Sequence, residues 1–204
     1  LWEGETYTPP FYEGANLWGA QSMIKLVAIP QGINEVVSYV WSRNGTVLGS
    51  LSGPERNSLR VEDSIFSKTQ SIRVELRNSA GKTIVENSIN ITPVAQEVWV
   101  YENHPTLGYL FNQTVSNSYT IRADEINLAS FPIYFSVRSK EDQTINFSWR
   151  SNSREDGQNN SVTYRVPEGE SGQTSIRSRI SLPQYLKQTA EKNFLIQFGN
   201  TNEN

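Results

Sequence analysis

The sequence contains no cysteine and only one histidine, His104, among its 204 residues. Without a disulfide, which contributes roughly 2–5 kcal/mol in small domains, the fold must be held together by apolar packing. This absence argues against a vertebrate-type receptor ectodomain, because immunoglobulin domains of that class usually join their sheets through a disulfide. Ser-His and Cys-His nucleophiles require a histidine or a thiol, and tetrahedral zinc sites usually require several. A sequence with one histidine and no cysteine has almost none of these residues. We therefore expect a non-enzymatic protein with no catalytic residue, no cofactor and no metal site.

The sequence also has little excess of either charge and no long apolar run. The formal net charge is -3, and the 18 basic residues are scattered without a basic stripe, so we expect no nucleic-acid partner. The longest apolar run, residues 23–29, is interrupted by Lys25 and is far shorter than the roughly 20 residues that span a bilayer. Because the sequence starts at Leu1 rather than Met, we expect that a signal or membrane anchor has been removed.

One loop has the oxygen-rich composition of a cation site. Residues 154–160 include Asp156 and Asn159, which with backbone carbonyls offer some of the roughly six to eight oxygens that calcium takes. The loop lacks the alternating aspartates of an EF-hand. We therefore favour a solvated hairpin loop over a calcium site.

The sequence does contain one motif written twice. Residues 39–45 read YVWSRNG and residues 146–152 read NFSWRSN, and each places a tryptophan in a strand-like run before a polar turn. A second apolar run precedes each copy, at residues 24–29 and 133–137. The copies lie about a hundred residues apart, which is the size of one β-sandwich domain. We therefore predict an all-β protein made of two tandem Ig-like β-sandwich domains.

The first domain is predicted to span residues 1–94 and to consist of short strands joined by turns. Asn44-Gly45 predicts a two-residue hairpin, because both turn positions require positive φ. Residues 71–77 show the clearest alternation of apolar and polar side chains. Two prolines restrict the first segment, residues 6–14, to an extended edge strand. The other strands are predicted at residues 22–30, 37–42, 58–62 and 83–92.

The second domain is predicted over residues 95–204, after a short linker that holds the two domains as a semi-rigid pair. A proline followed by apolar residues three to four positions apart favours one short helix at residues 183–190. The tail, residues 199–204, is predicted to be disordered. Strands are predicted at residues 97–101, 133–138, 144–150, 162–166, 174–180 and 193–198 and at two places within 109–122, with a longer polar loop at 154–160.

Aromatic residues gather at the start of each predicted domain. Exposed rings in a row can stack on sugars or form a protein-binding patch. The alternative, which we favour, is that they cap the sandwich ends and the joint between the domains. Trp41 and Trp149 are predicted to be core residues, because they match the tryptophan of the third strand in immunoglobulin sandwiches. The candidate residues for contact with a protein or glycan partner are Trp2, Tyr7, Phe11, Tyr12, Trp18, Trp99 and Tyr101.

Several of these segments resemble known proteins. Residues 40–45, 72–76 and 80–82 resemble bacterial Ig-like and PKD-like repeats, although the PKD hallmark Trp-x-Phe-Gly-Asp-Gly is absent. The segments that are similar to uncharacterised exported surface proteins of candidate-phylum bacteria are residues 7–14, 89–93 and 101–108. The resemblance implies an envelope or surface location, for example beside pilus or secretion components. It implies no catalytic residue.

These observations together favour an exported or cell-surface protein with a structural or adhesive role. Such a protein acts as a spacer, a filament component or a partner-binding module, and its partners are a protein or glycan at the cell surface or further copies of itself. Two alternatives stay open. The aromatic segments fit a carbohydrate-binding module, and the fold fits accessory domains of a larger exported enzyme.

Overall fold

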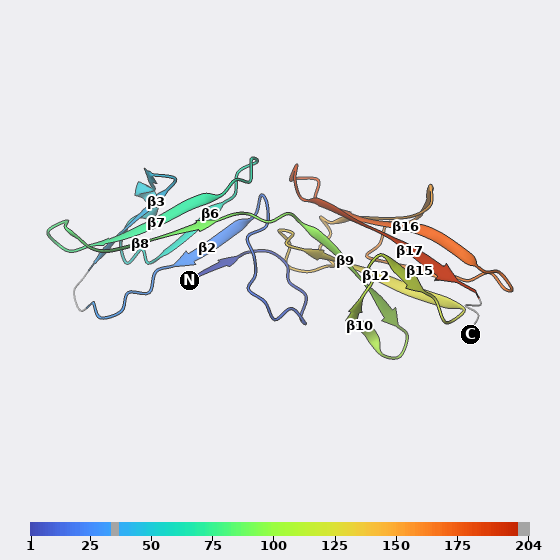
Figure 1. The fold of residues 1–204 in the computed structure, drawn as a ribbon. Helices are drawn as coiled ribbons and strands as arrows, with labels where there is room; N and C mark the ends of the chain where they lie inside the picture. The colour runs from blue at the N-terminus through green and yellow to red at the C-terminus, as the bar shows by residue number, and fades with distance from the viewer. Residues whose placement is uncertain (34–36, 200–204) are drawn as a thin grey trace. The chain divides into compact units, whose positions relative to one another are not determined.

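The computed structural model describes residues 1–33 and 37–199, which form strands β1 to β17 and one short 3-10 turn, η1 (Figure 1). Tertiary contacts divide the chain into two compact units. Unit 1 comprises Leu1–Thr6 and Gly14–Val94, and unit 2 comprises Tyr7–Glu13 and Ala95–Asn204. The described residues include no helix long and apolar enough to cross a bilayer.

Unit 1 consists of two antiparallel sheets. One sheet has the order β1-β2-β6, and the other has the order β4-β3-β7-β8, with β5 also paired to β3. The elements are β1 (Trp2–Gly4), β2 (Met23–Val27), β3 (Ser38–Arg43), β4 (Thr46–Val47), η1 (Gly49–Leu51), β5 (Gly53–Pro54), β6 (Ser58–Glu62), β7 (Gln70–Arg77) and β8 (Thr83–Ile91).

The core of unit 1 lies between these two sheets. Leu26 of β2 and Leu59 of β6 come from one sheet, and Trp41 of β3 with Ile72 and Leu76 of β7 come from the other. All five side chains are at most 4% exposed. Full burial of a large apolar side chain contributes roughly 1.5–3 kcal/mol, so packing of this kind takes the place of a disulfide.

Unit 2 also consists of two sheets. One has the order β10-β9-β12-β15, and the other has the order β11-β17-β16-β13-β14. All neighbours are antiparallel except β11, which runs parallel to β17. The strands are β9 (Glu97–His104), β10 (Gly108–Thr114), β11 (Ser118–Thr120), β12 (Glu125–Ile133), β13 (Asn146–Ser151), β14 (Arg154–Gly157), β15 (Ser161–Arg165), β16 (Gly172–Ser181) and β17 (Thr189–Phe198).

The sheet orders of the two units correspond. The order β1-β2-β6 matches β9-β12-β15, and β4-β3-β7-β8 matches β14-β13-β16-β17. The predicted all-β fold of two Ig-like sandwiches is therefore confirmed. In unit 2 the buried hydroxyls of Ser130 on β12 and Ser178 on β16 lie 2.5 Å apart and link the two sheets where many sandwiches carry a disulfide.

The two tryptophans of the repeat occupy corresponding strands, β3 and β13. Trp41 is 2% exposed and Trp149 is 0% exposed, which confirms that both are core residues. Each indole also finds a backbone acceptor, as buried tryptophans usually do. Trp41 Nε1 donates to the carbonyl oxygen of Arg56 at 2.7 Å, and Trp149 Nε1 donates to that of Asn159 at 2.9 Å.

The predicted hairpin after the first tryptophan strand is confirmed. Asn44 and Gly45 have φ values of 51° and 81°, and β3 pairs with β4 across them. Asn152, with φ of 51°, turns the chain in the same way between β13 and β14. The longer polar loop predicted at residues 154–160 is therefore wrong, because most of it is strand β14.

The strand predicted at residues 133–138 is also wrong. The actual strand, β12, ends at Ile133, and Tyr134 then turns the backbone with φ of 63°. Tyr134, Phe135 and Val137 are nevertheless at most 7% exposed. These residues are apolar because the loop is buried, and not because it is a strand.

No helix forms at residues 183–190. The amide of Leu182 donates to the carbonyl oxygen of Gln188 at 2.9 Å and closes a loop. The buried Gln188 side chain accepts from the amide of Ser136 and donates to the Ser136 hydroxyl, each at 2.8 Å. These tertiary hydrogen bonds override the local helix propensity, and β17 begins at Thr189.

The predicted edge strand at residues 6–14 is absent, since no strand is found there. Most of this segment, Tyr7–Glu13, packs with unit 2, where the amide of Tyr7 donates to the carbonyl oxygen of Phe135 at 2.8 Å. The tail beyond Gly199 lies outside the described residues.

Candidate functional site

The seven aromatic residues predicted as contact residues do not form one surface. Trp2 and Trp18 belong to unit 1, whereas the other five belong to unit 2. Trp18 is 0% exposed, and its Nε1 donates to the carbonyl oxygen of Ser22 at 2.9 Å. Trp18 therefore presents no ring face to a ligand, whereas Trp2 is half-buried and lines a groove described below.

In unit 2 the predicted aromatic residues pack against one another. The ring of Phe11 stacks on that of Phe111, with 4.0 Å between centroids, and meets the edge of Tyr101 at 5.2 Å. Tyr101 is 3% exposed, and its burial raises the pKa of its phenol. Burial likewise raises the pKa of Tyr7 to about 12. Edge-on and stacked pairs of this kind stabilise a core, so these rings serve packing.

Two of the predicted residues lie at the margin of this aromatic cluster. Trp99 is half-buried, and its Nε1 donates to Glu97 Oε2 at 2.8 Å. The Tyr12 ring lies 6.2 Å from that of Trp99, and its hydroxyl is 3.3 Å from the Tyr134 hydroxyl. Trp99 and Tyr12 therefore keep part of their ring at the surface of unit 2, as does the half-buried Phe11.

The side chains considered for catalysis or metal binding have structural partners. His104 Nδ1 accepts from the amides of Thr106 and Leu107, each at 3.3 Å, and so holds the β9–β10 turn. Asp156 accepts from the Ser151 and Tyr164 hydroxyls at 2.8 and 3.0 Å. In the described part of the chain, no three His, Cys, Asp or Glu residues gather as metal ligands would.

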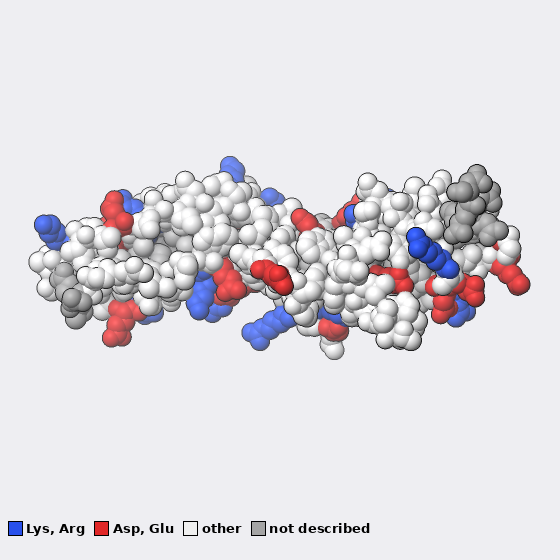
Figure 2. Space-filling view, turned by 60° about the horizontal axis from the view of Figure 1, so that its bottom comes forward, with Lys and Arg blue, Asp and Glu red and all other residues white. Residues whose placement is uncertain are grey.

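Both signs of charge are interspersed on the surface. Figure 2 shows Lys and Arg among Asp and Glu on the face drawn, with no continuous patch of either sign. A nucleic-acid-binding surface concentrates basic side chains on one face or along one groove. The face drawn has no such concentration.

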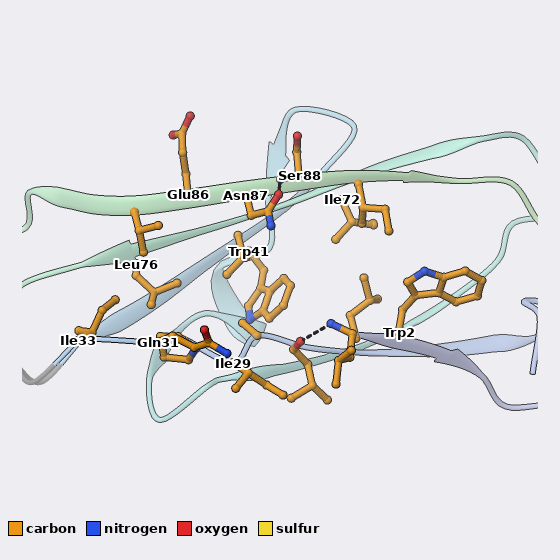
Figure 3. A pocket seen from close by; sticks show the side chains of 18 residues that line it. Trp2, Ile29, Gln31, Ile33, Trp41, Ile72, Leu76, Glu86, Asn87 and Ser88 are labelled. Atoms are coloured by element: carbon orange, nitrogen blue, oxygen red, sulfur yellow. Dashed lines mark hydrogen bonds between the residues drawn. The ribbon is translucent and has the colours of Figure 1, made fainter. Parts of the chain in front are cut away.

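A groove lies between the two sheets of unit 1, and we call it the unit 1 groove (Figure 3). Its volume is about 840 Å³. Trp2 of β1 and Ile29 after β2 form one wall, β7 and β8 form the other, and Trp41 lies at its base. Pockets that bind ligands measure roughly 300–1,000 Å³, so the groove is large enough to hold one.

The groove is open because β8 extends past the strands that face it. Val85 and Ile89 of β8 pair with Leu76 and Ile72 of β7, and paired residues of antiparallel strands point to the same face. Both side chains therefore face the core side, yet Val85 is 44% exposed and Ile89 is 38% exposed. The facing edge strand, β1, has only three residues and does not cover them.

The lining of the unit 1 groove is almost free of charge. Among its described residues, Glu86 has the only charged side chain, and its carboxylate is paired with the Arg73 guanidinium. The amino group of Leu1 donates to the carbonyl oxygen of Val27 at 3.0 Å. Asn87, between Val85 and Ile89, is the one polar side chain on the inward face of β8 within the groove.

Sequence reasoning identified Trp2 and predicted the strand at residues 83–92, but it did not identify this strand as the other wall of a groove. The signal was present, because Val85, Ile89 and Ile91 recur at even spacing in β8. This pattern predicts a half-buried strand and does not reveal that the opposite wall is short.

Comparisons with known proteins give structural likeness alone. No protein-family model matches the chain, and no curated protein matches its sequence. Three N-terminal domains of the bacteriophage RB49 Highly Immunogenic Outer Capsid protein (Hoc) are 12% identical, with a TM-score of 0.44 over 89% of this chain and 56% of that one. The chain thus spans little more than half the length of that structure.

Two further structures have lower scores. The Clostridium thermocellum CbhA fibronectin(III)-like modules are 10% identical, with a TM-score of 0.32 over 91% of this chain and 90% of theirs. A biofilm-associated protein, in its BSP domain, is 12% identical, with a TM-score of 0.24 over 89% of this chain and 28% of that one.

Proposed function

We propose that this chain is a non-enzymatic structural or adhesive protein of the cell surface or the extracellular space, and that it binds a partner protein through the unit 1 groove. The observation that carries this proposal is the groove itself. It exposes Ile89 of β8, whereas unit 2 buries Phe194 at the corresponding position. Apolar surface held open in this way marks interaction sites.

The location is part of the same proposal. The Ig-like sandwiches and the resemblance of residues 7–14, 89–93 and 101–108 to exported surface proteins support it. We propose the two units as two domains of a spacer or filament component, in which unit 1 supplies the binding groove.

The carbohydrate-binding alternative has less support. Sugar sites use exposed ring faces, whereas Phe11 and Tyr101 pack into unit 2 and Trp18 is buried. Trp2 and Trp99 remain half-buried and are the rings to test. A role as accessory domains of a larger enzyme is compatible with the same groove.

A bead-binding assay tests the proposal. The purified chain is coupled to beads, which are offered intact bacterial cells, purified cell-wall polysaccharides and beads that carry a second copy. We expect retention on at least one protein-bearing surface, and its loss in Ile89→Lys. The matched control is Ile84→Lys, because Ile84 is 37% exposed on the same strand but does not line the groove.

Three results would overturn the proposal. The first is retention that Ile89→Lys leaves unchanged. The second is retention on polysaccharide alone that is lost on Trp2→Ala or Trp99→Ala, which supports the carbohydrate alternative. The third is turnover of a substrate that a point mutation abolishes.

A further inference from the structure

Unit 2 closes the side of its sandwich that corresponds to the unit 1 groove. The residues before and within β11 cross from one sheet to the other. Val115 donates to the carbonyl oxygen of Val100 on β9 at 2.8 Å. On the other sheet, Leu195 of β17 donates to Asn117 at 2.9 Å, and Ile121 donates to Gln197 of β17 at 2.8 Å.

The crossing segment carries three apolar side chains that are buried or half-buried. Val115 is 1% exposed, Ile121 is 7% exposed, and Tyr119 between them is half-buried. Tyr119 and Ile121 are alternate residues at β11, so their side chains point to the same face, and Val115 lies before a bend at Asn117. In unit 2, therefore, a short uncharged strand fills the gap between the sheets.

The consequence is visible at matched positions. Ile72 pairs with Ile89 in unit 1, and Ile176 pairs with Phe194 in unit 2. These pairs correspond, because Ile72 and Ile176 each lie two residues before the partner of the core tryptophan. Ile89 is 38% exposed, whereas Phe194 is 3% exposed.

Among the described residues of unit 1, no such segment runs along β8. The connection from β1 to β2 lies at the corresponding place in the chain, but Tyr7–Glu13 packs with unit 2. What remains is a single parallel bridge between Gly19 and Val94, beyond the end of β8 at Ile91. In the described part of the chain, β8 is therefore paired on one side only, with β7.

The free edge of β8 also lacks the usual protection. Edge strands commonly carry lysine or proline, which block pairing with another chain. Residues 83–91 read TIVENSINI and contain neither. The one charged side chain of the strand, that of Glu86, is already paired with Arg73.

We infer that a partner supplies the missing strand to unit 1. An extended peptide segment adds to the free edge of β8 and inserts its alternate side chains into the unit 1 groove. This inference rests on the proposed function and names the form that the partner takes. Main-chain hydrogen bonds provide affinity in such strand additions, and side-chain pockets provide selectivity.

The charge of the groove sets the chemistry of the inserted side chains. No side chain of its described lining carries an unpaired charge, and the Leu1 amino group donates to the Val27 carbonyl oxygen, so an inserted Lys, Arg, Asp or Glu would meet no free charged side chain and would be buried at a large cost. The occupant therefore has uncharged apolar residues at the positions that face the groove, as unit 2 has with Tyr119 and Ile121 at the end of β11.

Peptide binding to the full chain tests this inference. The first probe is the capped, uncharged peptide of residues 114–121 (TVSNSYTI), and a small panel of uncharged ten-residue peptides with apolar residues at alternate positions accompanies it. We expect saturable binding below 1 mM by at least one peptide and slower hydrogen exchange at β8 amides. Ile89→Lys should weaken binding at least tenfold, and Ile84→Lys should change it less than twofold.

Two peptide controls separate strand addition from general stickiness. In the peptide, replacement by lysine of the first and the last residue that face the groove should weaken binding at least tenfold. Methylation of the peptide nitrogen that corresponds to that of Ile121 removes an edge hydrogen bond and should also weaken it. Val85→Lys repeats the groove test should Ile89→Lys fail to fold, since Val85 is 44% exposed on the same wall.

Three outcomes overturn the inference. One is that no peptide of the panel binds at 1 mM, which rejects strand addition while groove-dependent retention on beads still supports the proposed function. Another is binding that is insensitive to nitrogen methylation and is reproduced by small apolar molecules, which assigns the groove to a small ligand. The last is a dimer that Ile89→Lys disrupts and peptides do not displace, which assigns the groove to a second copy.

Discussion

Asn44 and Ser71 are joined by two hydrogen bonds. The amide of Asn44 donates to the carbonyl oxygen of Ser71 at 2.8 Å, and the amide of Ser71 donates to Asn44 Oδ1 at 2.9 Å. The hairpin turn between β3 and β4 is thereby attached to β7. Asn152 and Ser175 make the same pair of contacts in unit 2, at 2.8 and 3.4 Å.

Asn44→Ala should destabilise unit 1 by about 1–3 kcal/mol. Alanine at φ of 51° is strained by roughly 1–2 kcal/mol, and the loss of the side-chain bonds adds about 1 kcal/mol. Asn44→Gly loses the same bonds without the strain and should cost less than Asn44→Ala. Urea unfolding followed by hydrogen exchange in each unit measures the difference, and equal costs for the two variants would contradict the explanation.

Removal of either core tryptophan should affect its own unit. Trp41→Ala and Trp149→Ala should each cost on the order of 3–5 kcal/mol, because each leaves a large cavity between two sheets. Trp41→Ala should lower the unfolding midpoint of unit 1, and Trp149→Ala should lower the unfolding midpoint of unit 2. Unchanged midpoints in both variants would mean that neither side chain supports its sandwich.

The features that the sequence could predict are those encoded by local patterns. Alternation identified β6 and β7, and Asn44-Gly45 identified the hairpin, because each needs only neighbouring residues. Strand β12 escaped prediction since its residues from Leu128 to Ile133 are buried on both faces and do not alternate. A continuously buried run of this kind has no period to detect.

The candidate site depends on contacts that no local pattern encodes. The short helix expected at residues 183–190 is replaced by a loop that Gln188 anchors to Ser136, 52 residues away in sequence. The segment between β1 and β2 that borders the unit 1 groove in sequence, Tyr7–Glu13, packs with unit 2. The sequence showed these residues to be extended and aromatic, and it contained no sign of which unit they join.

Unit 1 should lose stability in acid through Glu75. Hydrogen bonds from the Arg77 guanidinium, at 3.2 and 2.7 Å, hold the pKa of the Glu75 carboxyl below its usual value, and Thr83 and Arg73 lower it further against the opposing effect of burial. A carboxyl whose pKa is lower in the folded state stabilises the fold at pH values above its unfolded-state pKa, which is about 4.3 for Glu. This stabilisation is lost as the pH falls through the pKa of the folded state.

Glu75→Gln tests this dependence. The variant should be slightly less stable at pH 7, by no more than about 1 kcal/mol for a pair this near the surface. It should also lose less stability than the unaltered chain between pH 5 and pH 3. Chemical unfolding of both proteins at pH 5 and pH 3 measures how steeply the stability of unit 1 falls with pH, with unit 2 as the internal reference. Equal slopes for unit 1 in the two proteins would count against a role for Glu75.

Phe11 should stabilise the unit that is distant from it in sequence. Its ring stacks on Phe111 at 4.0 Å and meets Tyr101 and Phe131 edge-on, at 5.2 and 6.2 Å. Full truncation of a buried phenylalanine costs roughly 3–5 kcal/mol, and Phe11 is half-buried, so we expect about 2 kcal/mol for Phe11→Ala. Phe11→Leu keeps much of the apolar volume and should cost less.

The unit in which this loss appears is the decisive observation. If Tyr7–Glu13 packs as an integral part of unit 2, Phe11→Ala lowers the hydrogen-exchange protection of β9, β10 and β12 and leaves that of β3 and β7 unchanged. The ring contacts of Phe11 are all with unit 2, so a loss of protection in β3 and β7 would show that the segment supports unit 1. In that case the diversion of this segment would no longer explain why the unit 1 groove is open.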